Sequence, residues 1–415
     1  MCATTWKTCL KFVTSPGPAE TDMGIGKTEP PSATSTVLVL NAGSSSLKFA
    51  VFARDDGPDR KLCGGAVEGL GSDSASAHAR KGSERRARTP RGNDHRAALE
   101  ACFELLEELE LPKPTLIGHR VVHGGRAHTK PCWLDERVVE ELRSLVPLAP
   151  LHLPASIAGI EQAALLRPEA RQYACFDTAF HHAMPAVAKR LALPDELFEA
   201  GVQRYGFHGL SFEYVMSTLG TPPPARTIIA HLGAGASVVA VKDGCSIDTT
   251  MGLTPTGGVV MGTRCGDLDP GVLLHLAREQ GYSLDELEDL VNHRAGLVAL
   301  GGTSDMRELL SRRAQDQRAE RAVAIFSYSV KKAICALAGA LGGLDVLVFT
   351  GGIGEHAAPV RAAICSDLTW FGVELDLERN QRGDAMIHAA SSRAEIRVVN
   401  TDEDAVIARH ARSLS

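Results

Sequence analysis

TVLVLNAGSSSLKFAVF, residues 36–52, shows how the chain is built: two β-branched or aromatic runs flank a Gly/Ser turn, as in a β-hairpin. The same pattern returns in TIIAHLGAGASVVAVKDG, residues 227–244. A further apolar strand, DVLVF (345–349), leads into the Gly-rich segment TGGIGEH. One Gly-rich hairpin in each half predicts a duplicated α/β fold with an active cleft between the halves.

Length and composition favour a globular protein of two domains. A chain of 415 residues is too long for one ordinary core, and 44% hydrophobic and 23% charged residues are typical of globular proteins. The net charge of −6 argues against a nucleic-acid partner, and no apolar run approaches the roughly 20 residues that span a bilayer. Ten cysteines without CxxC or zinc spacing predict reduced thiols in a cytoplasmic protein. Residues 1–35 lack the apolar core of a signal peptide and are interpreted as a disordered extension.

Between the first hairpin and the middle of the chain, the stretch 71–96 is polar and basic. It is either a patch for an anionic partner or a solvated loop, and the lack of aromatic residues between its charges favours the loop. An amphipathic helix follows over 95–111, and helices dominate again from 285 to 341, apart from a loop, GGTSDMR, at 301–307.

The run MGLTPTGGVVMGTRCGDLDP, residues 251–270, has a different character. Its glycines and prolines break both helices and strands, so a rigid loop is expected. This loop presents one guanidinium, Arg264, whose planar and permanently charged fork suits an anion. The two Gly-rich hairpin turns have small residues and free N–H groups that can wrap phosphate oxygens, and Lys48 adds a positive charge beside the first. Neither turn has the spacing of a P-loop or of a dinucleotide-binding fingerprint.

Three further positions have two interpretations each. Asp177 follows an apolar strand, where it either faces a cleft or caps a helix. His208 lies between glycines and beside an aromatic residue, which allows a cleft position or a core position. His181 and His182 are neighbours that cannot converge on one metal ion, so a surface pair is expected.

Ten motifs, taken together, resemble those of the acetate kinase family, within the actin-like ATPase and sugar kinase superfamily. In chain order they are NAGSSSLKF (41–49), GHRVVHGG (118–125), APLH (149–152), FDTAFH (176–181), RYGFHG (204–209), HLGAGAS (231–237), MGLTP and MGTRCGDLDP (251–270), DMR (305–307), GGIGE (351–355) and TDE (401–403). They cover the chain from about residue 36 to its C-terminus.

The resemblance implies a fold and an activity. It implies two actin-like (ribonuclease H-like) α/β domains with mixed sheets flanked by helices: residues 36–177 with 400–415, and residues 178–399, which would carry nucleotide contacts and a homodimer interface. The activity implied is reversible transfer of phosphoryl between ATP and acetate, giving acetyl phosphate and ADP. The partners would be a small carboxylate and a nucleotide, with no membrane. The alternatives are a propionate or broader short-chain acyl kinase, a non-catalytic nucleotide-binding regulator and an ATP hydrolase.

The resemblance also implies site residues. The catalytic residues would be Asp177, His208 and Arg264, and the metal-site residues, for Mg²⁺ or Mn²⁺, would be Asn41 and Glu403. Substrate-binding residues would be Arg120, Val122, Leu151, Phe207 and Pro255. Nucleotide contacts would come from Lys48, His231, Leu232, Gly233, Ala234, Gly235, Asp305, Met306, Arg307, Gly352, Ile353, Gly354, Glu355 and His356.

The chain departs from the family pattern at a few positions. Ala234 stands where the second turn usually has asparagine, which removes a side-chain hydrogen-bonding group and is expected to alter nucleotide affinity. Leu153 and Ser156 replace two amides next to the acyl pocket, which puts the acyl preference in doubt. Gly257 stands for a glutamate and His356 for an asparagine, and nothing in the sequence explains the loss of the glutamate.

Overall fold

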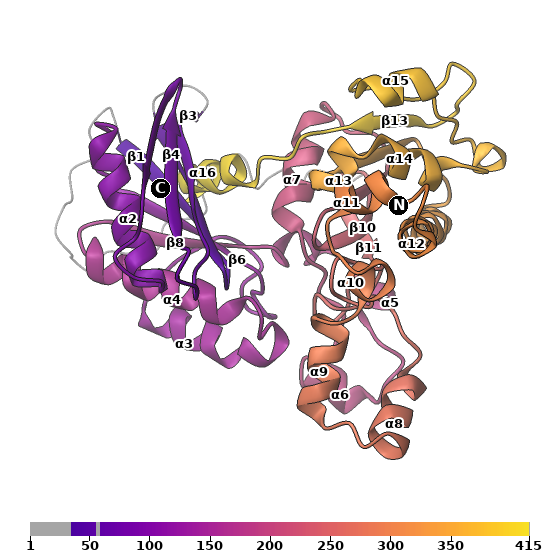
Figure 1. Ribbon diagram of the computed structural model, residues 1–415, viewed down its shortest axis with the longest axis horizontal. Coiled ribbons are helices and arrows are strands. Elements are labelled where there is room, and N and C mark those ends of the chain that lie inside the picture. The colour runs from indigo at the N-terminus through magenta and orange to yellow at the C-terminus, as the bar shows by residue number, and fades with distance from the viewer. Residues whose placement is uncertain (1–34, 55–58, 415) are drawn as a thin grey trace, which may run out of the picture. The chain divides into compact units, whose positions relative to one another are not determined.

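The computed structural model describes residues 35–54 and 59–414, which form two compact units. Unit 1 contains the chain up to Ala179 and again from Asp402, and unit 2 runs from Phe180 to Thr401. Apart from Ser35, which begins the first strand, the expected N-terminal extension lies outside the described residues. Figure 1 shows that both units combine a sheet with helices.

Unit 1 is built on an eight-stranded mixed sheet in the order β5-β4-β3-β2-β1-β6-β8-β7. The strands are β1 (Ser35–Ala42), β2 (Ser46–Arg54), β3 (Arg60–Glu68), β4 (Ser76–Lys81), β5 (Glu84–Arg88), β6 (Leu116–Val121), β7 (Cys132–Trp133) and β8 (Arg171–Phe176). The predicted first hairpin is confirmed, because β1 and β2 pair antiparallel, with Asn41 opposite Lys48. The central strands β1, β6 and β8 run parallel, so their carboxyl ends share one edge of the sheet.

Helices cover the two faces of this sheet. They are α2 (His95–Glu108), α3 (Glu136–Ser144), α4 (Leu153–Leu166) and α16 (Glu403–Ser413). Leu38 and Leu40 of β1 form a buried cluster with apolar residues of α2. On the alternate face, Gly118 of β6 leaves no room for a Cβ beside Ile407 of α16. The C-terminal helix therefore completes the core of the unit that begins with β1.

The expected solvated loop over 71–96 is wrong, because β4 and β5 lie within it. Along β4 the side chains alternate between exposed and buried, and the buried ones are Ala77 and Ala79. Alanine is too small to give a clear period-2 hydrophobic signal, so the sequence pattern looked merely polar. On β5, Arg88 pairs with Glu104 and Glu108 of α2, which holds this exposed edge strand.

Unit 2 is built on a five-stranded sheet in the order β11-β10-β9-β12-β13. Its strands are β9 (Arg226–Leu232), β10 (Ala236–Lys242), β11 (Cys245–Thr249), β12 (Val346–Thr350) and β13 (Glu395–Val398). The second predicted hairpin is confirmed by antiparallel pairing of β9 with β10, while β12 runs parallel to β9 and β13.

The helices of unit 2 lie mostly between β11 and β13 in the chain. They are α5 (Ala186–Lys189), α6 (Asp195–Glu199), α7 (Gly209–Thr218), α8 (Pro270–Glu279), α9 (Leu284–Asn292), α10 (Gly296–Gly301), α11 (Met306–Arg312), α12 (Gln317–Leu341), α13 (Gly351–His356), α14 (Ala358–Cys365) and α15 (Leu377–Arg382). Residues 251–269 form neither helix nor strand, as their glycines and prolines predict. The apolar strand β12 ends at Thr350, and the Gly-rich segment after it forms the short helix α13.

The long helix α12 is more apolar than its sequence pattern suggested. Among the described residues it is the one helix long and apolar enough, by length and composition, to cross a membrane. A buried core helix passes the same test, and α12 packs against β9, β10 and β11. The sequence showed no such run because charged residues interrupt α12 at Lys331 and Lys332.

Buried His119 in unit 1 and buried His181 in unit 2 make stability depend on pH. Burial lowers the pKa of His119 to about 4, and its Nε2 lies 2.6 Å from Gln172 Oε1. Burial likewise lowers the pKa of His181 to about 4, with Ser246 Oγ at 2.9 Å from Nδ1 and the Phe207 carbonyl oxygen at 3.0 Å from Nε2. The expected surface position of His181 is therefore wrong.

We expect the free energy of unfolding to fall as the pH drops from 6.5 towards 4. The unfolded histidines bind protons near pH 6.5, whereas the folded ones stay neutral until about pH 4. At roughly 1.4 kcal/mol per pH unit, each of the two histidines lowers the free energy of unfolding by about 2 kcal/mol between pH 6.5 and 5.0. Urea unfolding at pH 7.5 and 5.0 measures this, and His119→Gln should reduce the difference between the two pH values. An equal difference in the variant contradicts the assignment.

Candidate functional site

In unit 1, three predicted site residues gather where the parallel strands end. Asn41 is the next-to-last residue of β1, Arg120 the next-to-last of β6, and Asp177 directly follows β8. Because these strands are parallel neighbours, their carboxyl ends lie at one edge, where α/β proteins commonly bind ligands. The topology thus brings together residues that are 79 and 57 positions apart along the chain.

Arg120 is the centre of this group. Its Nε and Nη2 donate to the two carboxylate oxygens of Asp177, at 3.2 and 2.8 Å. Its Nη1 lies 3.2 Å from Glu403 Oε2. Burial alone would lower the pKa of Arg120, but the two carboxylates raise it well above its usual value. Asp177, with 1% of its side chain exposed, accepts hydrogen bonds from Arg120 at both carboxylate oxygens.

Glu403 reaches the group from the opposite end of the chain. It is the first residue of α16, whose N-cap Asp402 accepts from the Ala405 N–H at 3.0 Å. Asn41 and Glu403 supply amide and carboxylate oxygens, the donors that a hard cation such as Mg²⁺ prefers. Among the described residues there is no group of three His, Cys, Asp or Glu that could hold a metal. The residues therefore fit an ion that keeps water and substrate phosphate as its other ligands.

The remaining residues assigned to unit 1 lie around this edge. Lys48 is exposed on β2, opposite Asn41. Val122 packs against the apolar cluster of α3 and α4, to which Leu153 belongs as a fully buried residue. Ser156 is also buried, and its hydroxyl donates to the His152 carbonyl oxygen at 3.3 Å. The two departures near the acyl pocket thus fill the core of unit 1, and Leu151, just before α4, is half-buried.

In unit 2, His208 is held in a defined orientation. It precedes α7 with the left-handed backbone angles φ 59° and ψ 24°. Ser237 Oγ of β10 lies 2.9 Å from its Nδ1, and its ring stacks on that of His231 at 4.3 Å. His231 is in turn fixed by Ser211, whose Oγ lies 2.8 Å from its Nδ1. A non-glycine residue in this backbone region, fixed from two sides, is typical of a functional site.

Arg264 approaches the same place from the loop 251–269. Its Nη1 donates to the Pro255 carbonyl oxygen at 2.8 Å. A Cβ on Gly235 would lie 3.2 Å from His208 Nε2 and 3.4 Å from Arg264 Nη2, so these residues converge on the second hairpin turn. Burial lowers the pKa of Arg264, and no described carboxylate forms an ion pair with it. A half-buried guanidinium with no carboxylate partner can bind an anion.

Phe207 and Pro255 lie beside these two groups. The Phe207 ring is buried, and Pro255 is buried as well. Val122 and Leu151 belong to unit 1, so the four residues expected to line the acyl pocket are divided between the units.

The predicted nucleotide segments surround the second hairpin turn. In the turn, the Gly233 N–H donates to the Gly235 carbonyl oxygen, and the exposed Ala234 accepts through its own carbonyl oxygen from Gly262 N–H at 3.1 Å. A Cβ on Gly262 would touch both Ala234 and Ser304, which places the segment Asp305–Arg307 nearby. Leu232 is buried at the end of β9.

Two of these segments form helix ends. Asp305 caps α11 by accepting from the Arg307 N–H at 2.8 Å, so the expected loop ends there, with Met306 buried and the Arg307 side chain exposed. Gly352, Ile353, Gly354, Glu355 and His356 all lie in α13, directly after β12.

No sequence pattern distinguishes Ser211 and Ser237, which orient the two stacked histidines. Serine is common in every part of a protein, so only the contact with a histidine ring distinguishes these two. Their partners lie 20 and 29 residues away in the chain.

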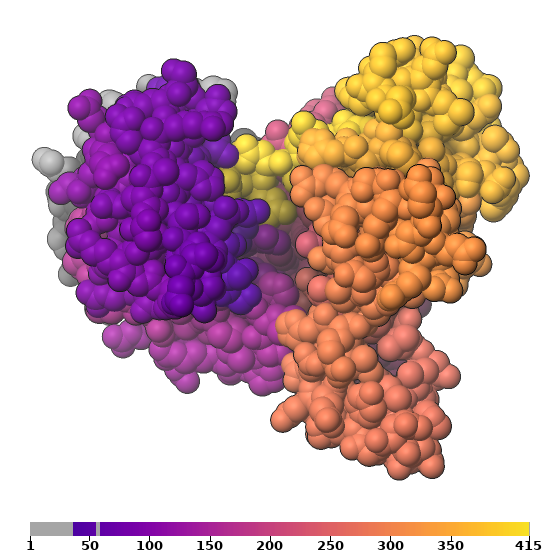
Figure 2. Space-filling view, viewed as in Figure 1, coloured from indigo at the N-terminus to yellow at the C-terminus, as the bar shows by residue number. Residues whose placement is uncertain are grey.

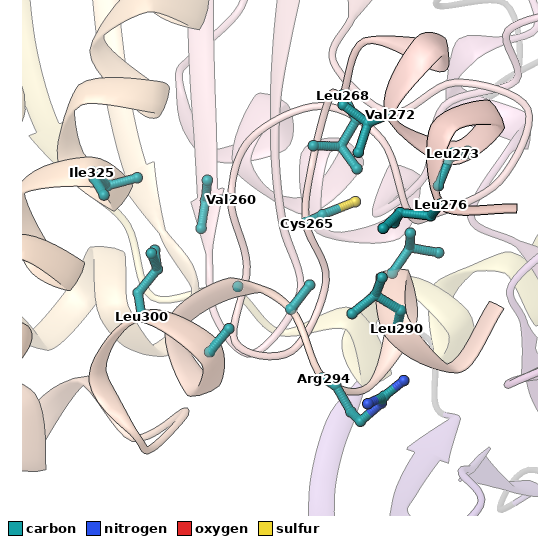
Figure 3. Close-up of a pocket in the computed structure, with 14 residues that line it drawn as sticks. Val260, Cys265, Leu268, Val272, Leu273, Leu276, Leu290, Arg294, Leu300 and Ile325 are labelled. Atoms are coloured by element: carbon teal, nitrogen blue, oxygen red, sulfur yellow. The ribbon is translucent and has the colours of Figure 1, made fainter. Parts of the chain in front are cut away.

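Unit 2 also has an apolar pocket of about 360 Å³. It is lined by residues of α8, α9, α10, α12 and the preceding loop, including Cys265, Leu268, Leu276 and Ile325, with Arg294 as its charged member (Figure 3). None of the predicted site residues lines this pocket, so size alone does not identify the place of chemistry.

Comparison with known proteins agrees with this geometry. Residues 36–409 match the model of the acetokinase family. An acetate kinase of Rhodopseudomonas palustris is 44% identical over 395 residues, which cover 91% of this chain and 98% of the relative. An acetate kinase of Syntrophobacter fumaroxidans is 44% identical over 393 residues, covering 90% and 95%.

Solved structures give the same result. A propionate kinase from Francisella tularensis has a TM-score of 0.86 and 37% identity, covering 92% of this chain and all of the other. An acetate kinase from Porphyromonas gingivalis has a TM-score of 0.80 and 36% identity, covering 90% and 98%. The predicted α/β fold class, with mixed sheets flanked by helices, is confirmed. With its family model matched over 36–409, the chain belongs to the acetokinase family.

Proposed function

We propose that the chain catalyses reversible, Mg²⁺-dependent phosphoryl transfer between ATP and acetate, giving acetyl phosphate and ADP. The observation that carries the proposal is Arg264: a half-buried guanidinium beside His208 and the second hairpin turn, with no described carboxylate to neutralise it. A transferring phosphoryl group carries negative charge on its equatorial oxygens, so cationic stabilisation and positioning supply most of the catalysis.

The residues of unit 2 act on the transferring phosphoryl group. Arg264 donates two N–H groups to its oxygens, and the Pro255 carbonyl fixes the direction of the guanidinium. His208 donates through Nε2, since its Nδ1 is engaged by Ser237. Neither residue gains or loses a proton during transfer in this account.

The residues of unit 1 act on the acetate and the metal. Arg120 binds the acetate carboxylate, and Asp177 sets its orientation through two hydrogen bonds. Acetate is already ionised at neutral pH, so it attacks the γ-phosphorus without a general base. A bound Mg²⁺, held by Asn41 and Glu403, would neutralise charge on the nucleotide phosphates. Mn²⁺ offers the same coordination chemistry.

The nucleotide binds through Lys48, the turn 231–235, and the segments 305–307 and 352–356. The two units correspond in this proposal to the two actin-like domains, 36–177 with 400–415 and 178–399. The division into units supports these proposed domain bounds, because the C-terminal helix α16 belongs to unit 1. We propose that the protein acts in the cytoplasm, without a nucleic-acid or membrane partner.

We expect Ala234→Asn to tighten nucleotide binding. Ala234 is exposed at the tip of the second turn, and asparagine adds a hydrogen-bonding group there without disturbing the core. One net hydrogen bond of about 1 kcal/mol corresponds to roughly a five-fold lower Kd for ADP, measured by isothermal titration calorimetry. An unchanged Kd would mean that the turn contacts nucleotide through its backbone alone.

Acetate is the proposed acyl substrate, and propionate is the alternative that a specific observation favours. One solved relative is a propionate kinase, with 37% identity to this chain. One extra methylene changes binding in an apolar pocket by only about 1–3 kcal/mol. Comparing kcat/KM for acetate, propionate and butyrate by ADP release separates these functions. ADP release without any acid would indicate an ATP hydrolase, and nucleotide binding without release would indicate a regulator.

A homodimer through unit 2 completes the proposal. Six apolar side chains at α8, α9, α12 and the loop before α8 are between 36% and 83% exposed: Leu268, Val272, Leu274, Leu284, Ile325 and Tyr328. In Figures 1 and 2, α8 and α9 lie at the surface of unit 2. Apolar surface of this kind beside an apolar pocket is typical of a subunit interface.

The interface has a direct test. We expect Val272→Asp to shift the mass measured by light scattering from dimer to monomer, because a carboxylate there would be buried without a partner. Val187→Asp is the control, since Val187 is 88% exposed on α5, an element outside the proposed interface. A wild-type monomer, or dissociation by both variants, would contradict the proposed interface.

A further inference from the structure

One carboxylate oxygen of Glu355, in the proposed nucleotide segment 352–356, accepts hydrogen bonds from the backbone. Its Oε1 accepts from the Gly351 N–H at 3.0 Å and from the Thr401 N–H at 3.1 Å. The Thr350 hydroxyl lies 3.4 Å from the same oxygen. Only 13% of the Glu355 side chain is exposed. One oxygen therefore joins the start of α13 to Thr401, which lies 46 positions after Glu355.

The helix that carries Glu355 is fixed at both ends. At its first residue, Gly351 has φ +76° and lies so close to the backbone of Leu232 that a Cβ would be 2.8 Å from the carbonyl oxygen. At its end, the buried Arg361 donates to the carbonyl oxygens of Gly354 and Glu355, at 2.8 and 2.9 Å. Glu355 thus projects from a helix that is held at both ends, and it binds the Thr401 backbone from there.

Thr401 lies at the junction between unit 2 and the C-terminal helix of unit 1. It is the last residue of unit 2, and Asp402, the N-cap of α16, is the first of the C-terminal part of unit 1. Glu403 follows directly and contacts Arg120. The hydroxyl of Thr401 is buried without a hydrogen-bond partner among the described residues, so the hold on this residue depends on its N–H.

We propose that Glu355 is a positioning residue for the metal site: by fixing the Thr401 backbone it sets the place of Glu403, two residues later. The inference rests on the proposed function, because it takes Glu403 as a ligand of the divalent cation. Loss of the acceptor frees the segment before α16, and a carboxylate ligand that must be ordered on binding gives weaker metal affinity.

The test compares two variants that lose the same kind of contact. Glu355→Leu removes the acceptor of the Gly351 and Thr401 N–H groups. Asp316→Leu is the matched control in unit 2, because Asp316 Oδ1 also accepts from two backbone N–H groups, those of Arg318 and Ala319, at the start of α12. Glu355→Gln keeps an oxygen acceptor of the same reach. Free Mn²⁺ is followed by electron paramagnetic resonance during titration of each protein with ADP present, and thermal unfolding is recorded in parallel.

We expect Glu355→Leu to raise the Kd for Mn²⁺ about ten-fold, the usual effect of losing a residue that orients a metal ligand. Glu355→Gln should stay within about three-fold of wild type, and Asp316→Leu should lower the Tm without changing the Kd. Equal effects of the two leucine variants on the Kd, or none from Glu355→Leu, would overturn the proposal. If Glu355→Leu does not fold, Glu355→Asp, which is too short to reach both N–H groups, replaces it against Glu355→Gln. Because Mn²⁺ binding is measured without turnover, failure of the acetate kinase activity would be seen separately.

Discussion

Arg264→Ala is expected to lower kcat by about 10³- to 10⁵-fold, the range for an arginine that stabilises a transferring phosphoryl group. Arg264 is half-buried, forms no ion pair with a described carboxylate, and converges with His208 on the second turn. Without the guanidinium, the negative charge on the transferring phosphoryl group loses a hydrogen-bond donor. The measurement is acetate-dependent ADP release under saturating MgATP, with the Kd for ADP determined beside it.

Two further variants make this result specific. Arg264→Lys keeps the charge but not the planar fork, so we expect it to recover only a small part of kcat. Arg318→Ala removes an exposed arginine of the same unit, whose Nη2 reaches the Ala299 carbonyl oxygen at 3.4 Å, and should leave kcat unchanged. If Arg264→Ala changed only the Kd for ADP while kcat stayed normal, Arg264 would be a nucleotide-binding residue.

Asp177→Asn is expected to lower kcat/KM for acetate by about 10²- to 10³-fold, which corresponds to the roughly 3–4 kcal/mol lost when one partner of a buried charged pair is removed. Asparagine turns one of its two acceptors into a donor that faces the Arg120 guanidinium, so the fork is no longer held at both N–H groups. Because Asp177 acts through Arg120, we expect a raised KM for acetate together with a lower kcat.

The pH profile separates this role from that of a general base. A base would contribute an acidic limb to kcat that disappears in Asp177→Asn, whereas an orienting residue leaves the shape of the profile unchanged. Asp59→Asn is the control, since Asp59 pairs with Arg412 in the same unit at 2.7 Å and has 8% of its side chain exposed. Loss of the acidic limb in Asp177→Asn alone would identify Asp177 as the base.

The parts of the fold that the sequence predicted are those with strong local patterns. The hairpins β1–β2 and β9–β10 consist of β-branched runs around Gly-rich turns, and both form. The loop 251–269 was predictable because glycine and proline act locally. β4 was missed because its inward residues are Ala77 and Ala79, so its strand formation depends on packing against α2.

Site residues were predictable to the extent that their chemistry is local. Arg264 in a Gly-rich loop indicated an anion site from its immediate neighbours. The ion pair of Asp177 depends on Arg120, 57 residues earlier in the chain, so no local pattern predicted it. The burial of His181 likewise depends on Ser246, which reaches it from β11. The Glu355–Thr401 contact spans 46 residues and has no local signal at all.

The most direct test of the account is trapping of acyl phosphate as its hydroxamate, with MgATP and acetate, propionate or butyrate offered separately. We expect product with acetate at the highest kcat/KM, a weaker signal with propionate, and none from Arg264→Ala with any acid. Absence of hydroxamate from the wild-type protein with all three acids, in a preparation that still binds ADP, would contradict the assignment of this chain as an acetate kinase.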